Sequence, residues 1–343
     1  MSNETAPTPA TKHTRQDYIS STEPKWCQGC GCYAVLKNLT SLFATLDLSP
    51  EKIAVISGIG CSSRTPYYVN SYGFHTLHGR APTVAIGLKM AQPELSVWIT
   101  TGDGDALAIG GNHFLHMMRR NPDIKMLLFN NQIYGLTKGQ ASPTTVPGTK
   151  AKGVPDGAFE SPVHPVALAI AAGASFVARV PDIDSPMVNE VLLAAAAHKG
   201  TAFIEVLLNC PTFSEGAFTI LTDRETKAGA TVRMSAGKPL VFGAQSDQGI
   251  RINPQTFKPE VAKFEAGKPP ADLLIHNPTT CEASLAYSLA MLDSPVLLGI
   301  FRQEQRTVYG ESLPRADTIT DVGDLLQGDG AWRETGSGPQ PLG

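Results

Sequence analysis

The sequence predicts an α/β protein with a doubly wound parallel sheet, followed by an irregular C-terminal extension. Short apolar runs near residues 53, 97, 126, 176 and 203 have the length and composition of buried strands. The segments between these runs have helical patterns, and strands that alternate with helices form parallel sheets. Glycine-rich or polar loops follow several of the runs, at the place where open α/β sheets bind their ligands.

The first element in chain order is a Thr-, Ser- and Pro-rich stretch over 1–22, which we expect to be a flexible tail. Helices are expected over 33–46, 81–91, the segment after Gly104, 164–172 and 185–198. Strands are expected over 52–57, from Val97 to the Gly-Asp-Gly turn, in the run before Asn130, over 175–180 and over 202–208. We assign this alternating region, 23–223, to one domain.

The alternating pattern ends after Asp223. Residues 224–270 are rich in Gly, Pro and Lys, with only short β-like pieces, and 278–292 and 294–301 are the next plausible helix and strand. The last stretch, 303–343, is polar and rich in Gly and Pro. We therefore expect 224–343 to be an extension that wraps another surface, not an independent domain.

Composition excludes several classes of protein. A hydrophobic content of 42% with 17% charged residues is typical of a globular chain. The net charge of −3 gives no reason to expect nucleic acid or an anionic membrane as a partner. No apolar run approaches the roughly 20 residues that span a bilayer, and 1–22 contains no signal-peptide core. We expect a cytoplasmic protein, in which cysteines bind metals or take part in catalysis rather than form disulfides.

The stretch from Val97 to Thr137 carries the main chemical signal. In a parallel sheet, the strand ends at Asp103 and Asn131 lie at the same edge. With the carbonyl of Ile133, these side chains supply the hard oxygen ligands that Mg²⁺ prefers. Gly102 and Gly104 allow a diphosphate to approach the backbone at a helix N-terminus. The pattern resembles the magnesium-diphosphate motif of thiamine diphosphate enzymes; the alternative is an ordinary α/β turn followed by an Asn-rich loop.

Four of the six cysteines fall on loops expected at that edge, namely Cys27, Cys30, Cys61 and Cys210. Four thiolates suit either Zn²⁺ or a [4Fe–4S] cluster, and the spacing does not decide between them. A thiamine carbanion nearby favours iron–sulfur, because an electron-rich intermediate needs an electron acceptor. We expect Cys32 and Cys281 to bind no metal.

Two further segments are candidates for function. The region from Lys138 to Phe159 is a long Gly- and Pro-rich connection, which is typical of a functional loop or lid. Lys138 is either solvated or able to meet an acidic substrate. His75 and His78 are either a hydrogen-bonded loop pair or donors to a phosphate or a thiazolium substituent.

Five segments together resemble the β subunit of the 2-oxoacid:ferredoxin oxidoreductases, in particular the 2-oxoglutarate branch, also called 2-oxoglutarate synthase. They are WCQGCGC, SGIGCSSR, GFHTLHGRAPTVAIGLKMA, GDGDALAIGGNHF and NNQIYGLTKGQ, and they cover roughly residues 26–210. The resemblance implies a sheet of the thiamine diphosphate-binding type. It carries little information about the C-terminal third.

The resemblance also implies roles for individual residues. Asp103, Asn131 and the Ile133 carbonyl would bind Mg²⁺, and Cys27, Cys30, Cys61 and Cys210 would ligate one [4Fe–4S] cluster. Thiamine diphosphate would contact Ile59, Gly60, Cys61, Ser62, Gly104, Asp105, Asn131, Gly135 and Leu136, with His78 at its diphosphate. The glutamate that activates the aminopyrimidine would come from a separate α subunit.

The implied reaction is reversible, coenzyme A-dependent oxidative decarboxylation of 2-oxoglutarate to succinyl-CoA and CO₂, which in reverse serves the reductive TCA cycle. The implied partners are ferredoxin and the α subunit, in an (αβ)₂ assembly. We assign Arg64 and Lys138 to the distal carboxylate of the substrate, and we expect 224–343 to cover the cluster or the α-subunit interface. The alternatives are the same chemistry on pyruvate or another 2-oxoacid, a non-oxidative thiamine diphosphate decarboxylase or carboligase, and an electron-transfer protein with a vestigial thiamine site.

Overall fold

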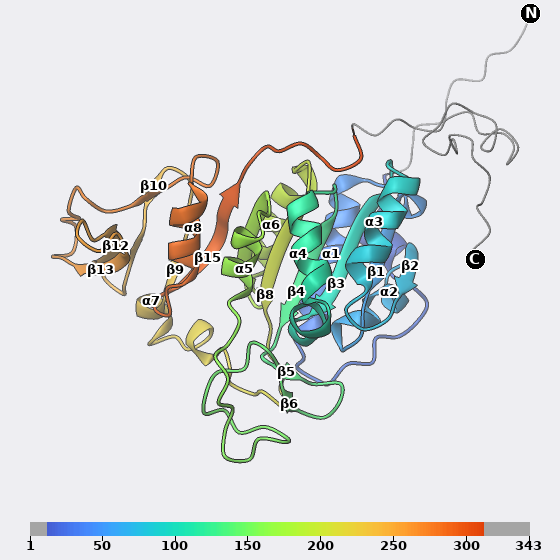
Figure 1. Cartoon of the computed structure of the whole chain (residues 1–343), viewed down its shortest axis with the longest axis horizontal. Helices are drawn as coiled ribbons and strands as arrows, with labels where there is room; N and C mark the ends of the chain where they lie inside the picture. The colour runs from blue at the N-terminus through green and yellow to red at the C-terminus, as the bar shows by residue number, and fades with distance from the viewer. Residues whose placement is uncertain (1–11, 312–343) are drawn as a thin grey trace, which may run out of the picture. The chain divides into compact units, whose positions relative to one another are not determined.

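The computed structural model describes residues 12–311, which build an eight-stranded sheet between two layers of helices (Figure 1). The strand order is β2-β1-β3-β4-β8-β7-β15-β9. The strands are β1 (Ile53–Ser57), β2 (Tyr72–His75), β3 (Ser96–Gly102), β4 (Lys125–Asn130), β7 (Phe176–Pro181), β8 (Ala202–Leu207), β9 (Thr231–Arg233) and β15 (Val296–Gln303). The pairs from β2 to β7 are parallel, which confirms the predicted fold class.

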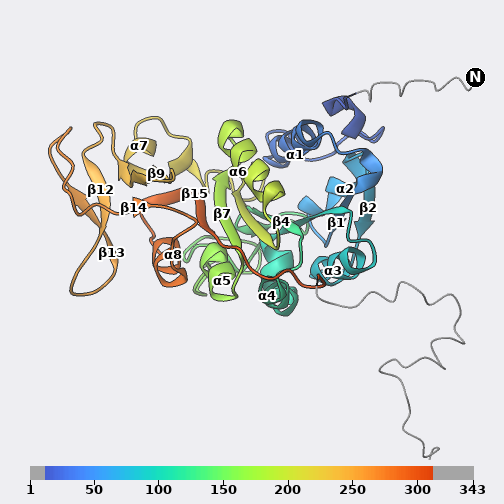
Figure 2. The same cartoon turned by 90° about the horizontal axis from the view of Figure 1, so that it is seen from above.

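Helices cover both faces of the sheet (Figure 2). One face carries α1 (Cys32–Leu46) and α6 (Ser185–Ala197); the other carries α3 (Ala81–Ala91), α4 (Gly111–Arg120), α5 (Pro165–Ala171) and α8 (Ala283–Ala290). Successive β1 residues point to opposite faces, so Ile53 and Val55 join one core while Ala54 and Ile56 join the other. Burial on both faces explains why the strands are continuous apolar runs in the sequence. Within residues 12–311, none of the helices combines the length and apolarity needed to traverse a bilayer.

Residues 12–22, which we expected to belong to a flexible tail, are packed against the domain. A 3₁₀ turn over Arg15–Tyr18 places the Tyr18 ring, fully buried, beside Phe43. The Tyr18 hydroxyl donates a hydrogen bond to the Leu48 carbonyl at 2.6 Å. One buried aromatic side chain thus anchors a stretch whose composition is otherwise polar. The remainder of the expected tail, 1–11, lies outside the described residues.

Strand β2 lies where we expected only a loop. It pairs in parallel with β1 at the edge of the sheet, and all four of its residues are exposed. Because β2 has four residues and neither of its faces is buried, its sequence lacks the continuous apolar run by which the other strands were predicted. The short helix α2 (Thr65–Tyr68) precedes it.

The C-terminal extension contributes to the main sheet instead of only wrapping it. Strand β15 pairs antiparallel with β7, with an irregularity between Ile300 and Arg302, and β9 pairs in parallel with β15. The smaller elements of the extension are α7 (Lys227–Ala230), β10 (Lys238–Pro239), β11 (Val241–Phe242), β12 (Gln248–Ile252), β13 (Pro259–Lys263) and β14 (Ile275–His276). No break in the sheet therefore marks the expected boundary after 223; residues 312–343 lie outside the described part.

His198 is buried at the amino-terminal edge of the sheet with its ring neutral. Its Nε2 lies 2.7 Å from the Ser175 hydroxyl, which donates its own proton to Asn121 Oδ1 at 2.6 Å. His198 therefore donates from Nε2, and its buried Nδ1 has no partner among the described residues. Burial, and secondarily the nearby Lys125 ammonium, lower the pKa of His198 to about 4.

We expect this histidine to make stability fall as the pH drops from 6.5 to 4. In that range His198 binds a proton in the unfolded chain but stays neutral in the folded protein. The free energy of unfolding therefore falls by up to about 1.4 kcal/mol for each pH unit. Denaturant unfolding of the wild type and of His198→Gln at several pH values measures this slope. The slope should be smaller in the variant, and equal slopes would contradict the assignment of a neutral His198.

Candidate functional site

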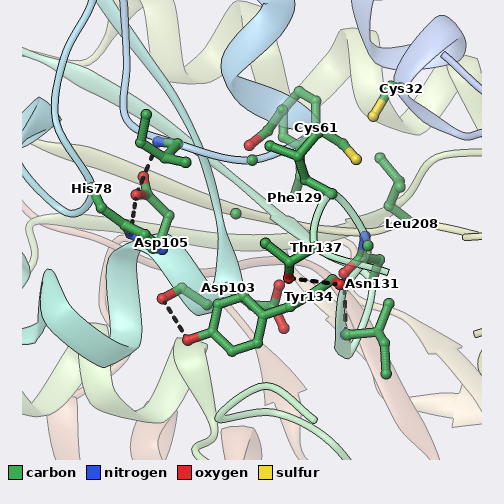
Figure 3. A pocket seen from close by; sticks show the side chains of 18 residues that line it. Cys32, Cys61, His78, Asp103, Asp105, Phe129, Asn131, Tyr134, Thr137 and Leu208 are labelled. Atoms are coloured by element: carbon green, nitrogen blue, oxygen red, sulfur yellow. Dashed lines mark hydrogen bonds and ion pairs between the residues drawn. The ribbon is translucent and has the colours of Figure 1, made fainter. Parts of the chain in front are cut away.

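The loops that follow β1, β3 and β4 meet at the carboxyl edge of the sheet around a cavity of 80 Å³ (Figure 3). All the residues predicted to contact the cofactor or Mg²⁺ line this cavity. They are Ile59, Gly60, Cys61, Ser62, His78, Asp103, Gly104, Asp105, Asn131, Ile133, Gly135 and Leu136. The fold thus brings together segments that are far apart in the sequence, and their roles stay predictions.

Asp105 connects three loops of the site. Its Oδ1 accepts hydrogen bonds from the backbone N–H groups of Ile59 (3.0 Å) and Gly79 (2.8 Å), and its Oδ2 accepts one from Thr101 Oγ1 (2.7 Å). His78 Nδ1 lies 2.7 Å from Oδ1 (Figure 3). The buried carboxylate therefore positions the glycine-rich loop after β1, and it lies beside the imidazole of His78.

Asp103 is buried deep in the same cavity. Its Oδ2 accepts hydrogen bonds from the hydroxyls of Ser142 and Thr144, each at 2.6 Å. Burial raises the pKa of Asp103 to about 6, although both hydrogen bonds oppose this shift. Sequence reasoning missed Ser142 and Thr144; their only signal was a run of hydroxyl residues in the connection that we expected to be a functional loop or lid.

Tyr134 explains why position 104 is glycine. Strand β5 (Ile133–Tyr134), paired with β6 (Gln140–Ala141), places the tyrosine hydroxyl 3.1 Å from the Gly104 carbonyl, to which it donates. A Cβ atom at position 104 would lie 2.1 Å from the tyrosine ring. Beyond Gly104, the chain forms a π-helical turn, Asp105–Ile109, before α4 begins. Because the Tyr134 ring lies so close to Gly104, position 104 can present only its backbone to the cavity.

The cavity has the chemistry that a magnesium diphosphate requires. Asp103, Asn131 and the Ile133 carbonyl offer hard oxygen donors, which suit Mg²⁺. The Ser62 hydroxyl is buried, lines the cavity and has no hydrogen-bond partner among the described residues. A buried hydroxyl without a partner is costly unless a ligand satisfies it. None of the described residues that line the cavity is a glutamate.

The four cysteines predicted to bind a cluster share a second cavity of 250 Å³, lined by Cys27, Cys30, Cys61 and Cys210. Burial, then the neighbouring thiols, raise the pKa of Cys61 to about 11. Thiolates on one Zn²⁺ lie roughly 4 Å apart. Within residues 12–311, no three Cys, His, Asp or Glu side chains are close enough together for a single metal ion.

The other two cysteines lie apart from this group. Cys32 is buried and lines the first cavity, and the neighbouring Cys32 thiol lowers the pKa of Cys30 to about 7. Cys281 lies near the start of α8 and lines neither cavity.

Arg64 and Lys138 both line the cysteine cavity, not the one around Asp103. Arg64 donates a hydrogen bond from Nη1 to the Lys25 carbonyl. In the part of the chain that the structure describes, no carboxylate forms an ion pair with Arg64, so a structural partner does not account for its charge. Lys138 has a left-handed backbone, φ 79°, in the turn that follows β5.

Comparisons with known proteins agree with this geometry. Residues 58–206 match the family model described as thiamine pyrophosphate enzyme, C-terminal TPP binding domain. The chain is 43% identical over 314 residues to the 2-oxoglutarate oxidoreductase subunit KorB of Mycobacterium tuberculosis, with 90% of this chain and 83% of that protein covered. It is 48% identical over 190 residues to the 2-oxoacid:ferredoxin oxidoreductase 1, subunit beta, of Aeropyrum pernix, with 55% of this chain and 60% of that protein covered.

A solved structure gives the same result for the fold. A chain of the 2-oxoglutarate:ferredoxin oxidoreductase from Magnetococcus marinus, with 2-oxoglutarate, coenzyme A and succinyl-CoA bound, superimposes with a TM-score of 0.70 at 29% identity. The match covers 92% of this chain and 90% of that one. The family model and this structure confirm a sheet of the thiamine diphosphate-binding type.

Proposed function

This chain belongs to the family of 2-oxoacid:ferredoxin oxidoreductase β subunits, and from that premise we propose that it oxidises 2-oxoglutarate together with an α subunit. In the proposed reaction 2-oxoglutarate, coenzyme A and two oxidised ferredoxins give succinyl-CoA, CO₂, a proton and two reduced ferredoxins. One observation carries the proposal. The cavity around Asp103 and the four-cysteine cavity are adjacent and share Cys61, Asn131, Gly135 and Leu136 as walls. Electrons released in one cavity would therefore have a short path to the other.

The chemistry that thiamine diphosphate supplies when bound is addition to a 2-oxo carbonyl and acceptance of the electron pair that CO₂ leaves behind. Asp103, Asn131 and the Ile133 carbonyl would hold Mg²⁺. His78, whose Nδ1 lies 2.7 Å from Asp105 Oδ1, would donate to the diphosphate. These residues bind and orient, and the buried walls of the cavity limit the access of water.

The four cysteines would hold one [4Fe–4S] cluster, which passes single electrons and so fits ferredoxin as the acceptor. The raised pKa of the Cys61 thiol fits this role, because a buried thiol beside other thiols ionises more readily next to a bound cation. None of the described residues that line the first cavity is a glutamate, which supports an α subunit that completes the site. An (αβ)₂ assembly and a cytoplasmic location stay predictions.

Anaerobic co-purification with the α subunit tests the proposal directly. About four irons, about four sulfides and about one thiamine diphosphate per β chain are expected. Addition of 2-oxoglutarate with coenzyme A should then bleach the cluster absorbance. Zinc in place of iron, or thiamine diphosphate without bleaching by any 2-oxoacid, would point to a non-oxidative decarboxylase. Bleaching by pyruvate instead of 2-oxoglutarate would keep the chemistry and change the substrate.

We assign the distal carboxylate of the substrate to Arg64 and Lys138, because both cations line the cysteine cavity and Arg64 has no acidic partner among the described residues. A guanidinium can hold a carboxylate through two hydrogen bonds and keeps its charge. The same unpaired charge would disfavour a substrate that ends in a methyl group.

Arg64→Ala is therefore expected to lower kcat/KM for 2-oxoglutarate by about 10- to 100-fold, the value of a hydrogen bond to a charged group. Activity on pyruvate should not fall in parallel. Arg233→Ala, which removes a surface arginine paired with Glu190, is the matched control. An unchanged ratio of 2-oxoglutarate to pyruvate activity in Arg64→Ala would refute the assignment.

A further inference from the structure

A line of buried polar side chains crosses the sheet toward Asp103. Arg179 on β7 donates from Nε to Glu205 Oε2 at 2.6 Å, and Asn130 at the end of β4 donates from Nδ2 to Glu205 Oε1 at 2.7 Å. Arg179, Glu205 and Asn130 are 8%, 1% and 3% exposed. The Arg179 guanidinium also lies 5.5 Å from the ring centre of Phe301 on β15, so the C-terminal extension covers the far end of the line.

The Arg179–Glu205 pair determines how the Asn130 amide is oriented. A carboxylate only accepts hydrogen bonds, so it must face the NH₂ group of Asn130. The amide oxygen then points the other way, where it lies 2.9 Å from Thr144 Oγ1 and accepts from the Gln132 N–H at 3.2 Å. Loss of the Glu205 carboxylate would allow the Asn130 amide to rotate, so that its oxygen and its NH₂ group exchange places.

Thr144 connects the oriented Asn130 amide to Asp103. Its single hydroxyl proton lies between two acceptors, Asp103 Oδ2 at 2.6 Å and the Asn130 amide oxygen at 2.9 Å. Ser142 donates to the same Asp103 oxygen. No side-chain hydrogen bond to Asp103 Oδ1 occurs within residues 12–311, so the two hydroxyls hold one carboxylate oxygen and leave the other for a ligand.

We propose that Arg179, Glu205 and Asn130 are positioning residues that act through Thr144 on Asp103 and set the affinity of the site for Mg²⁺. This inference rests on the proposed function, since Asp103 must be a metal ligand. Stability alone does not require the arrangement, because apolar residues can often replace a buried ion pair without loss of stability. The line instead joins three parallel strands and the loop after β6 to one oxygen of one carboxylate.

The test measures Mg²⁺ binding, not turnover. The αβ enzyme is stripped of metal, saturated with thiamine diphosphate and titrated with Mg²⁺ by calorimetry. Thr144→Val and Glu205→Gln should each weaken Mg²⁺ binding by about 10- to 100-fold, the usual effect of losing a hydrogen bond that orients a metal ligand. Thr144→Ser should restore the affinity, because it returns the hydroxyl. Thr149→Val, the same substitution at an exposed position of the same loop, should leave it unchanged.

The double variant tests whether the two residues act in series. If Glu205 works through Thr144, Thr144→Val combined with Glu205→Gln should weaken binding no more than the larger single effect. Losses that add in full, or single variants that bind Mg²⁺ like the wild type, would overturn the inference. Thr144 lies in a loop, so its variant remains informative even if Glu205→Gln fails to fold. A wild-type enzyme that binds neither Mg²⁺ nor thiamine diphosphate would overturn the proposed function itself.

Discussion

Replacement of Asp103 by asparagine is expected to remove Mg²⁺ and thiamine diphosphate from the enzyme and to lower 2-oxoglutarate-dependent ferredoxin reduction by roughly 10³-fold, about 4 kcal/mol. Asparagine keeps an oxygen that can accept from Ser142 and Thr144, so the local fold should survive. The substitution removes the negative charge that a hard divalent cation needs. Metal and thiamine analysis of the purified αβ complex, beside its activity, measures both effects.

Asp156→Asn is the matched control, because it makes the same change at an exposed position of the loop that contains Ser142 and Thr144. It should retain full cofactor content. Cofactor content and activity equal to the wild type in Asp103→Asn would show that this carboxylate is not the metal ligand. The cluster should stay intact in both variants, because Asp103 lines only the first cavity.

Cys210→Ser is expected to give the opposite pattern, with loss of the cluster and retention of thiamine diphosphate. Cys210 lines the cysteine cavity and not the one around Asp103, whereas Cys61 lines both, so position 210 separates the two sites more cleanly. Iron and sulfide should fall and ferredoxin reduction should drop to background, because a cluster of this type relies on four thiolates. Iron, sulfide and thiamine analysis on one anaerobic sample provides the measurement.

Cys281→Ser controls for the general loss of a thiol, since Cys281 is half-buried and lines neither cavity. It should keep the cluster and full activity. If Cys210→Ser kept its iron and still reduced ferredoxin, the assignment of the four ligands would be wrong. If both variants lost iron, Cys281 would belong to the metal centre.

Much of the candidate site could be predicted because its residues stand directly after strands. Asp103 to Asp105 follow β3, Asn131 follows β4, and the loop with Cys61 follows β1. The carboxyl ends of parallel strands lie at one edge, so a correct list of strands already places these residues together. The order of the motifs along the chain then indicated the family.

Other features depend on contacts between segments that are distant in the sequence and leave no local pattern. We predicted that Tyr18 belongs to a flexible tail because the residues around it are polar. Its burial depends on contacts with distant residues, which local composition does not reveal. Strand β15 joins the sheet antiparallel to β7, a pairing that neither strand's composition specifies. Such pairings are chosen by the free energy of burial over the whole domain, not by local preference.

The sequence by itself determined the fold class, the site edge and the side chains gathered there, since strand periodicity and motif position are local properties of the chain. Only the tertiary structure showed that Ser142 and Thr144 hold Asp103 and that Arg179 and Glu205 lie behind them. The contact between Asn130 and Glu205, which links the two groups, joins residues 75 positions apart. Hydrogen bonds need specific distances and directions, and only the folded backbone supplies them.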